Sequence, residues 1–515
     1  MPPSIAVEDL KEKIELFLLE HSRPILSEPG QEVMDLSSSS YSFSTQYGKL
    51  LWHIWNEQTN VVRQITGINK ESKGRMELRY QKFGKGPAGT LVLADSRARP
   101  DQLDRRARRT QYLRTLRRWL NQLFPQWKVE ELTTEADLAR SFSGRYARGL
   151  ISRGNQAWAV IGTGDREDAS TADGILAYGL VWLDWLRQRT PDRVIAGLKL
   201  FLPAGKTATT QTRLAWLDPR LAQWELYETS DDAGDEARQC DIADIGNLKT
   251  NLAPLPRLAP GAPSGHGWAQ RIHSWSRDIE ARRGPDGSCS WSVRGLAFAR
   301  ETTKGVLFGL GRAETMLSEE NAAQLRSLVN RVVRFRRPDA KDRMHPLYRL
   351  QPERWMESVL TRELGAVGYD LEEGTVYEQV PAISGTDRGL MDLLTLSRSG
   401  RLVVMELKAS EDMQLPLQAL DYWMRVHWHH ERGDLERTGY FGGRSLSKQP
   451  PLLLLVSPAL QFHPACETIS RYLSPTIEVI RVGLNENWRE QLQVVFRQAS
   501  RSEPESGRSG VRGSV

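Results

Sequence analysis

The chain has 515 residues, of which 39% are hydrophobic and 26% charged, and its formal net charge is +6. This length exceeds what one hydrophobic core supports, so we expect several domains, and the mildly basic balance is compatible with a polyanionic partner. Three widely spaced cysteines without a C-x-x-C pair argue against a disulfide framework or a cysteine zinc site. We see no signal-peptide pattern and no apolar run of eighteen residues, so we expect a cytoplasmic protein without membrane spans.

The N-terminal region, residues 1–135, is predicted to combine a helix, a β-rich module and an arginine-rich helix. Residues 7–21 place apolar side chains at helical spacing. Residues 41–95 follow as short strand-like runs separated by turn signals, which predicts a small antiparallel sheet. Residues 101–124 then alternate leucines with a dense set of arginines, which indicates an amphipathic basic helix.

Basic side chains gather at two predicted helices. Arg105, Arg109 and Arg117 lie in the helix at 101–124, and Arg334 and Arg336 lie at the end of a helix over 318–335. Such residues can contact a phosphate backbone, and we take these five as candidate nucleic-acid contacts. A solvated basic surface without a ligand explains the same pattern.

The remaining chain divides by composition and periodicity. Residues 136–252 read as an α/β domain, because strands at 157–161 and 194–202 enclose a helix at 174–188. We expect a proline- and glycine-rich linker at 253–267 and an α+β connecting region at 268–350, with helices near 268–282 and 318–335 and strands at 290–300 and 304–310. A last folded domain at 351–498 and a disordered tail at 499–515 complete an α/β multidomain protein with mixed sheets.

One constellation in the last domain carries chemistry. Asp392 lies in an apolar, strand-like run, and Glu406-Leu407-Lys408 begins fourteen residues later at the end of another. The intervening Ser397-Arg398-Ser399-Gly400 is a natural hairpin turn, so we expect the two strands to be antiparallel neighbours. Within a strand, Glu406 and Lys408 share a face.

These residue types suit hydrolysis of a phosphodiester. Magnesium prefers oxygen ligands, which Asp392, Glu406 and the backbone carbonyl of Leu407 can supply. Metal-assisted hydrolysis needs an activated water and neutralisation of the charge that develops on phosphorus. We therefore predict a site for Mg²⁺ or Mn²⁺ in which Lys408 orients or deprotonates the attacking water.

Together with Gln418 and Tyr422, this segment resembles the PD-(D/E)xK nuclease superfamily, and within it the RecB-like and NucS-like branch. The resemblance covers about residues 352–460, and Met391 stands where the family has a proline. It implies a restriction-endonuclease-like αβββαβ core, with its final strand at 451–456. By position in that fold, Glu357 on the first helix is a further metal ligand, and Gln418 and Tyr422 belong to the site.

The expected function is a divalent-metal-dependent DNA nuclease acting in repair, restriction or antiviral defence, alone, as a homodimer or with a partner protein. The alternatives are cleavage of RNA and a non-catalytic nucleic-acid-binding or scaffold protein that reuses the fold. A plain surface ion pair between Glu406 and Lys408 is the simplest other explanation of the motif. His427 and His430 share a helix face but lack further zinc ligands, so a helix surface or a phosphate contact is the favoured reading.

The middle domain contains a possible second copy of the motif domain. When the sequence is shifted by 245, Ser152-Arg153 falls on Ser397-Arg398, and Ile161 and Thr163 fall on Glu406 and Lys408. Ala147 then falls on Asp392, and with one gap Tyr178 falls on Tyr422. We therefore consider a degenerate nuclease-like fold without catalytic groups, against chance similarity between two strand–helix–strand units.

Overall fold

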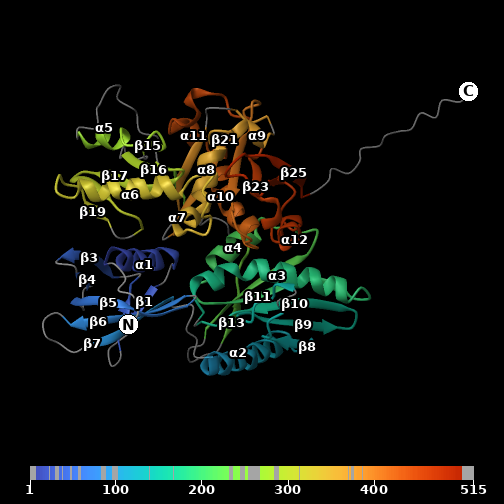
Figure 1. Cartoon of the computed structure of the whole chain (residues 1–515). Coiled ribbons are helices and arrows are strands. Elements are labelled where there is room, and N and C mark those ends of the chain that lie inside the picture. The colour runs from blue at the N-terminus through green and yellow to red at the C-terminus, as the bar shows by residue number, and fades with distance from the viewer. Residues whose placement is uncertain are drawn as a thin grey trace, which may run out of the picture. The chain divides into compact units, whose positions relative to one another are not determined.

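The chain is a mixed α/β protein that folds into two compact units in the computed structural model (Figure 1). Unit 1 comprises Met1–Gln102 and Pro256–Trp355, and unit 2 comprises Leu103–Leu255 and Met356–Val515. The structure describes residues 7–21, 24–28, 34–36, 39–46, 49–55, 60–72, 74–82, 88–95, 102–137, 140–165, 167–230, 236–243, 250–252, 267–283, 289–311, 314–368, 370–372, 376–384 and 387–500. Most of the predicted linker at 253–267 and of the predicted tail at 499–515 lies outside these residues.

The first part of unit 1 is a seven-stranded antiparallel sheet with one helix packed on it. Its elements are α1 (Val7–Glu20), β1 (Pro24–Ser27), β2 (Met34–Asp35), β3 (Ser40–Gln46), β4 (Lys49–Trp55), β5 (Asn60–Ser72), β6 (Arg75–Lys82) and β7 (Ala88–Asp95). The sheet order is β2-β1-β7-β6-β5-β4-β3. Leu10, Ile14 and Phe17 of α1 are buried in one core with the strands, as their helical spacing predicts.

The second part of unit 1 is a five-stranded antiparallel meander with its own core. Its elements are α5 (Trp268–His273), β15 (Ile279–Arg283), β16 (Cys289–Val293), β17 (Leu296–Thr302), β18 (Gly305–Phe308), β19 (Thr315–Met316), α6 (Ala322–Phe335) and α7 (Pro346–Arg349). The predicted helix over 268–282 is wrong in its second half. Residues from Ile279 onward instead form a strand, because they pair with β16 through Ile279 and Val293.

Unit 2 begins with a six-stranded mixed sheet that has a helix on each face. Its elements are α2 (Gln102–Leu123), β8 (Lys128–Thr133), β9 (Ala147–Arg153), β10 (Gln156–Gly162), α3 (Ala169–Arg189), β11 (Val194–Pro203), α4 (Ala208–Leu214), β12 (Gln223–Thr229) and β13 (Ala237–Gln239). Alternate residues of β10 divide between the two faces. Ala159 and Ile161 join the core that includes α3, and Trp158 and Val160 join the core that includes α2.

The second sheet of unit 2 has seven strands in the order β14-β20-β21-β22-β23-β24-β25. Its elements are β14 (Asn251–Leu252), α8 (Pro352–Leu360), α9 (Leu364–Val367), β20 (Tyr377–Ser384), β21 (Asp387–Leu396), β22 (Leu402–Leu407), α10 (Leu415–Glu431), α11 (Asp434–Arg437), η3 (Tyr440–Gly443), β23 (Leu452–Pro458), η4 (Ala459–Gln461), α12 (Ala465–Arg471), β24 (Val479–Leu484) and β25 (Val494–Ala499). The run at 451–456 is central and not final, since β24 and β25 extend the sheet beyond it.

The two sheets of unit 2 repeat one order of elements. Eight elements of the first sheet correspond in chain order to eight of the second. The first set is β8, β9, β10, α3, β11, α4, β12 and β13, and the second set is β20, β21, β22, α10, β23, α12, β24 and β25. Neighbouring strands agree in polarity throughout, being antiparallel, antiparallel, parallel, parallel and antiparallel in both sheets. One continuous core joins the helices α3 and α10 and the sheet faces beneath them.

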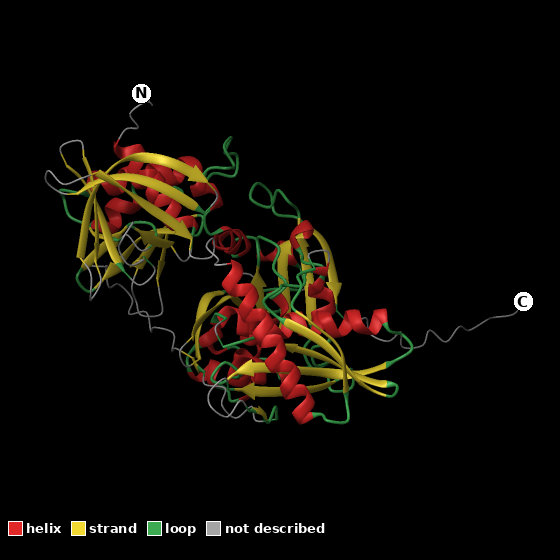
Figure 2. Cartoon of the chain, turned by 90° about the horizontal axis from the view of Figure 1, so that it is seen from below, coloured by secondary structure: helices red, strands yellow, loops and turns green. Residues whose placement is uncertain are grey.

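Figure 2 shows helices, in red, lying against the strands of the sheets, in yellow. Among the described residues, no helix is both long and apolar enough to cross a membrane.

Candidate active site

The hairpin that carries the motif forms as the sequence predicts. Strands β21 and β22 are antiparallel, with Leu393 opposite Met405 and Leu396 opposite Leu402. The turn closes through two hydrogen bonds. The amide of Ser397 donates to the carbonyl of Arg401 at 2.9 Å, and the amide of Arg401 donates to Ser397 Oγ at 3.1 Å. Gly400 has a φ of 79°, at which the backbone of a residue with a side chain would be strained. Glycine is therefore the residue that this turn needs.

Glu406 lies at the end of β22, on the face that α10 covers. Leu402 and Val404 point into the core that contains α10. Because every second residue of a strand shares a face, Glu406 points to the same side. Only 4% of Glu406 is exposed. A carboxylate so far removed from water needs a proton, a cation or hydrogen-bond donors, so glutamate is an unusual residue to find at the end of a central strand for structural reasons alone.

Lys408 follows directly after the strand and continues its pairing. Its amide donates to the carbonyl of Val456 at 3.0 Å, so the backbone still runs beside β23. Its ammonium lies 3.5 Å from Asp412 Oδ2, in a part-exposed ion pair. Asp412 also accepts the amide of Gln414 at 2.8 Å, which fixes the loop between β22 and α10. Asp412 is not among the predicted site residues, although an acid four residues after the motif lysine is a signal for it in the sequence.

Asp392 lies on β21, and its side chain is outside the described part of the structure. Leu393 is opposite Met405, so one further step of the same antiparallel register puts Asp392 opposite Glu406. The backbone therefore brings the two predicted carboxylate positions onto adjacent strands. That Asp392 ligates a metal stays a prediction.

Gln418 and Tyr422 lie one helical turn apart on α10, which packs on β22 and β23. Tyr422 is partly buried against the core, and the guanidinium of Arg425 lies 5.8 Å from the centre of its ring. Gln418 is also partly buried, and its amide oxygen has no hydrogen-bond partner among the described residues. Glu357 is buried on α8, where Thr361 donates to its backbone carbonyl at 2.7 Å. Its place among the metal ligands stays a prediction.

The five predicted nucleic-acid contacts have different surroundings. Arg117 and Arg334 are exposed, and Arg109 is half-buried, with its guanidinium against Gly144. The side chain of Arg105 lies outside the described part of the structure.

Arg336 is fully buried, and the prediction that it contacts nucleic acid is wrong. Its guanidinium donates to the backbone carbonyls of Arg294, Leu347, Leu350 and Gln351 at 2.5–3.2 Å and lies 4.7 Å from the ring centre of Trp355. It therefore ties three segments of unit 1 together. A basic run at a helix end cannot by itself distinguish such a residue from a surface arginine.

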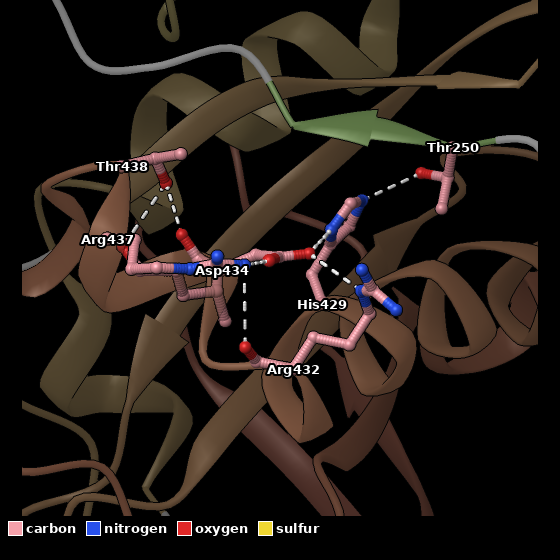
Figure 3. Close-up of polar contacts among 7 residues, drawn as sticks. Thr250, His429, Arg432, Asp434, Arg437 and Thr438 are labelled. Carbon is pink, nitrogen blue, oxygen red and sulfur yellow. Dashed lines mark hydrogen bonds and ion pairs between the residues drawn. The ribbon is translucent and has the colours of Figure 1, made fainter.

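The histidines near the C-terminal end of α10 make structural contacts. His429 Nδ1 lies 2.7 Å from Asp434 Oδ2, and its Nε2 lies 3.0 Å from Thr250 Oγ1, just before β14 (Figure 3). His427 stacks on Trp423, with ring centres 4.6 Å apart. Among the described side chains, no group of three His, Cys, Asp or Glu residues is arranged to hold a metal ion. Asp392 is not among those side chains, so this finding leaves the predicted metal site untested.

The six-stranded sheet of unit 2, the middle sheet, has other residues at the positions that correspond to Asp392, Glu406 and Lys408. In its hairpin, Arg148 is opposite Ile161, and the amide of Thr163 donates to the carbonyl of Phe201 at 3.1 Å, as Lys408 does to Val456. Ile161 and Thr163 thus match Glu406 and Lys408, as predicted from the sequence. The match of Ala147 to Asp392 is wrong by one residue, because the β9–β10 turn is one residue shorter than the β21–β22 turn. Arg148 stands there instead.

A buried ion pair joins α4, which follows β11 of the six-stranded sheet, to α10. We call α10 the motif helix because it carries Gln418 and Tyr422. Arg213 on α4 donates from Nε to Asp421 Oδ1 at 2.9 Å and from Nη2 to Oδ2 at 2.6 Å. Asp421 lies between Gln418 and Tyr422 on α10. Burial lowers the pKa of Arg213, but the neighbouring Asp421 carboxylate raises it more, so the net pKa is above the ordinary value. Sequence analysis had no signal for this pair, since its partners are 208 residues apart.

No family model matches the chain, and no curated protein matches it. One solved structure that matches is the crystal structure of the Thermoplasma acidophilum Pelota protein, which is 10% identical over 44% of this chain and 59% of that chain, with a TM-score of 0.11. The chain thus spans less than two thirds of that protein, and a TM-score this low carries no argument about fold or function.

Proposed function

We propose that the chain is a divalent-metal-dependent nuclease that hydrolyses phosphodiester bonds in DNA, with Asp392, Glu406 and Lys408 at its centre. The observation that carries the proposal is the buried carboxylate of Glu406 at the end of β22, two residues before Lys408 and under the motif helix α10. The simplest alternative is an exposed surface ion pair. It does not explain why only 4% of Glu406 is exposed.

The donor set fits Mg²⁺ or Mn²⁺. Asp392, Glu406, the carbonyl of Leu407 and Glu357 would hold the ion, and all four are the oxygen donors that these hard cations prefer. When bound, the ion would polarise the scissile phosphate and activate a water molecule. Lys408 would orient or deprotonate that water, and Asp412, 3.5 Å from its ammonium, would limit where the lysine can reach. Gln418 and Tyr422 would position the substrate from α10.

We also propose that this domain has the restriction-endonuclease-like core and that residues 136–252 are a degenerate copy of it. The antiparallel meander β20–β21–β22, followed by α10 and the parallel strand β23, supports the first proposal. The matching order and polarity of the strands in the two sheets support the second. Right-handed crossovers favour some likeness between any two such sheets, but they do not require the same eight elements in the same order.

The proposal is tested with purified protein on single- and double-stranded DNA and RNA, with Mg²⁺ or Mn²⁺. We expect Glu406→Gln and Lys408→Met each to lower cleavage of DNA by at least about 100-fold, within the range that loss of one catalytic or charge-stabilising group costs. Glu436→Gln and Lys448→Met, at exposed positions, are the matched controls and should retain activity. Titration calorimetry with Mn²⁺ should show weaker binding to Glu406→Gln.

Each other outcome favours a different function. If the wild type and Glu406→Gln are equally inert on every substrate, the nuclease proposal fails. Salt-sensitive binding without cleavage would then favour a nucleic-acid-binding or scaffold protein. Cleavage confined to RNA would assign a ribonuclease to the same site.

A further inference from the structure

The two halves of unit 2 pack on each other through reciprocal contacts. Leu217, after α4, pairs with Leu473, after α12, in an antiparallel bridge. Around this bridge the amide of Asp218 donates to the carbonyl of Tyr472 at 2.9 Å, and the amide of Ser474 donates to the carbonyl of Trp216 at 2.7 Å. Helices α4 and α12 are corresponding elements. The contact that the first half makes with the second is therefore the same as the contact that the second half makes with the first.

Side chains beside the bridge join the same pairs of elements, although not at corresponding positions, because Arg213 precedes Leu217 by four residues and Arg471 precedes Leu473 by two. Arg213 on α4 reaches Asp421 on α10, and Arg471 on α12 reaches Asp184 on α3, at an N–O distance of 3.8 Å. Each short helix thus sends an arginine to a carboxylate on the long crossover helix of the other half. Reciprocity of this kind is the property of a two-fold interface between like subunits. Within one chain it describes an internal pair of copies related by a pseudo-two-fold axis.

Only one member of the pair can carry the motif chemistry. At the three positions that match Asp392, Glu406 and Lys408, the middle copy has Arg148, Ile161 and Thr163, which are 3%, 0% and 0% exposed. Arg148 lies against the rings of Phe142 and Trp182, with its guanidinium 4.6 and 5.6 Å from their centres. The corresponding place in the middle copy is therefore packed with side chains, and it has neither carboxylate.

Duplex DNA has two antiparallel strands that are related by two-fold axes perpendicular to the helix. A two-fold dimer of identical subunits can place one site on each strand, as paired DNA-binding subunits do on half-sites. An internal pair with one working site has no second centre for the other strand. Because the strands run in opposite directions, that single site can attack the second strand only after release and rebinding in the reversed orientation.

We propose that this chain is an internal dimer with one working site, which cuts one strand of a duplex in each binding event and so produces nicks. This inference rests on the proposed nuclease function. In each event one water oxygen bonds to phosphorus, one P–O ester bond breaks, and the departing sugar oxygen takes a proton. The complementary strand stays intact.

The experiment uses the full-length protein, a supercoiled plasmid in excess over protein, and Mg²⁺ or Mn²⁺. We expect open circles to accumulate first, and linear molecules to follow only when random nicks on opposite strands come close together. A linear product that forms in constant proportion from the earliest time points would overturn the inference, whether it arises from one chain or from a dimer of chains. Sedimentation under assay conditions would tell those two cases apart.

Two further arms separate this inference from the proposed function. Glu406→Gln should leave the plasmid supercoiled, and equal inactivity of the wild type would reject the nuclease function and the nicking inference with it. Cleavage of single-stranded circles without any action on the plasmid would retain the nuclease function and overturn only the inference, which requires a duplex substrate.

Discussion

The ion pair between Arg213 and Asp421 offers a direct test of whether the middle domain positions the motif helix α10. The side chain of Arg213 is 5% exposed, and that of Asp421 is 21% exposed. The guanidinium also donates to the carbonyl of Asp173 at 2.6 Å, so it is fixed on both sides. Replacing it in Arg213→Gln removes the charge that Asp421 faces and leaves α10 without its bidentate anchor.

The cost follows from this geometry. Removing one partner of a buried ion pair typically costs about 3–5 kcal/mol, and the partial exposure of Asp421 lowers the expectation to about 2–4 kcal/mol. Gln418 and Tyr422 flank Asp421 on the helix, so a small shift of α10 moves both. Because a displacement of about 1 Å can cost about 100-fold in rate, we expect cleavage to fall about 10- to 100-fold.

The matched control is Arg471→Gln, at the reciprocal contact. Arg471 is 51% exposed and lies 3.8 Å from Asp184, so its loss should cost about 0–1 kcal/mol. Asp184 lies on α3 and not on the motif helix, and cleavage should stay near the wild-type rate. Both variants lie at the same interface, and of the two ion pairs only that of Arg213 has its carboxylate on α10.

A double-mutant cycle with Asp421→Asn completes the assay. Urea unfolding gives the free energy, and single-turnover cleavage at saturating protein gives the rate. We expect the double variant to lose less than the sum of the two single losses, with a coupling of about 1–3 kcal/mol. Additive losses in stability, or an Arg213→Gln variant that is destabilised but cleaves at the wild-type rate, would refute the positioning role.

Three further predictions concern stability. An added Cβ at Gly197 would lie 1.9 Å from the carbonyl oxygen of Gln223, so Gly197→Ala should cost about 1–3 kcal/mol or more and lower the thermal unfolding midpoint, whereas Gly267→Ala, in open space, should not. Arg336→Met should cost at least about 3 kcal/mol in urea unfolding, because it leaves several buried carbonyls without their donor, and its effect on DNA affinity should be no larger than that of the exposed variant Arg117→Ser. Burial lowers the pKa of His463, more than nearby Glu411 and Asp412 raise it, and its Nδ1 accepts the amide of Ala465 at 3.1 Å, as only the neutral ring can. The stability that this histidine provides is therefore present above its ordinary pKa of about 6.5 and is lost as the pH falls below that value. The thermal unfolding midpoint should fall more between about pH 7.5 and 5.5 in the wild type than in His463→Asn, which keeps an acceptor that does not titrate. An equal fall of the midpoint in both proteins would contradict this account.

Much of the local structure could be predicted because it depends on short-range patterns. The apolar spacing in residues 7–21 predicts the helix that the structure has at Val7–Glu20. The turn at Ser397–Gly400 predicts the hairpin, since glycine supplies the positive φ that closes it. The same reasoning fails at 268–282, where a helix-like pattern gives way to a strand from Ile279 onward because a neighbouring strand offers backbone partners.

Within the candidate site, the sequence determined which residue types stand at which strand ends, because the side-chain alternation of a strand and the length of a turn are local properties. Glu406 and Lys408 could be assigned from that pattern, and Ile161 and Thr163 could be matched to them. Only the tertiary structure decided that Arg148 and not Ala147 matches Asp392, since the register depends on a turn that is one residue shorter. It also decided that Arg336 is buried and that Arg213 pairs with Asp421 of the motif helix, because burial and ion pairing between residues far apart in the chain arise only when separate elements pack together.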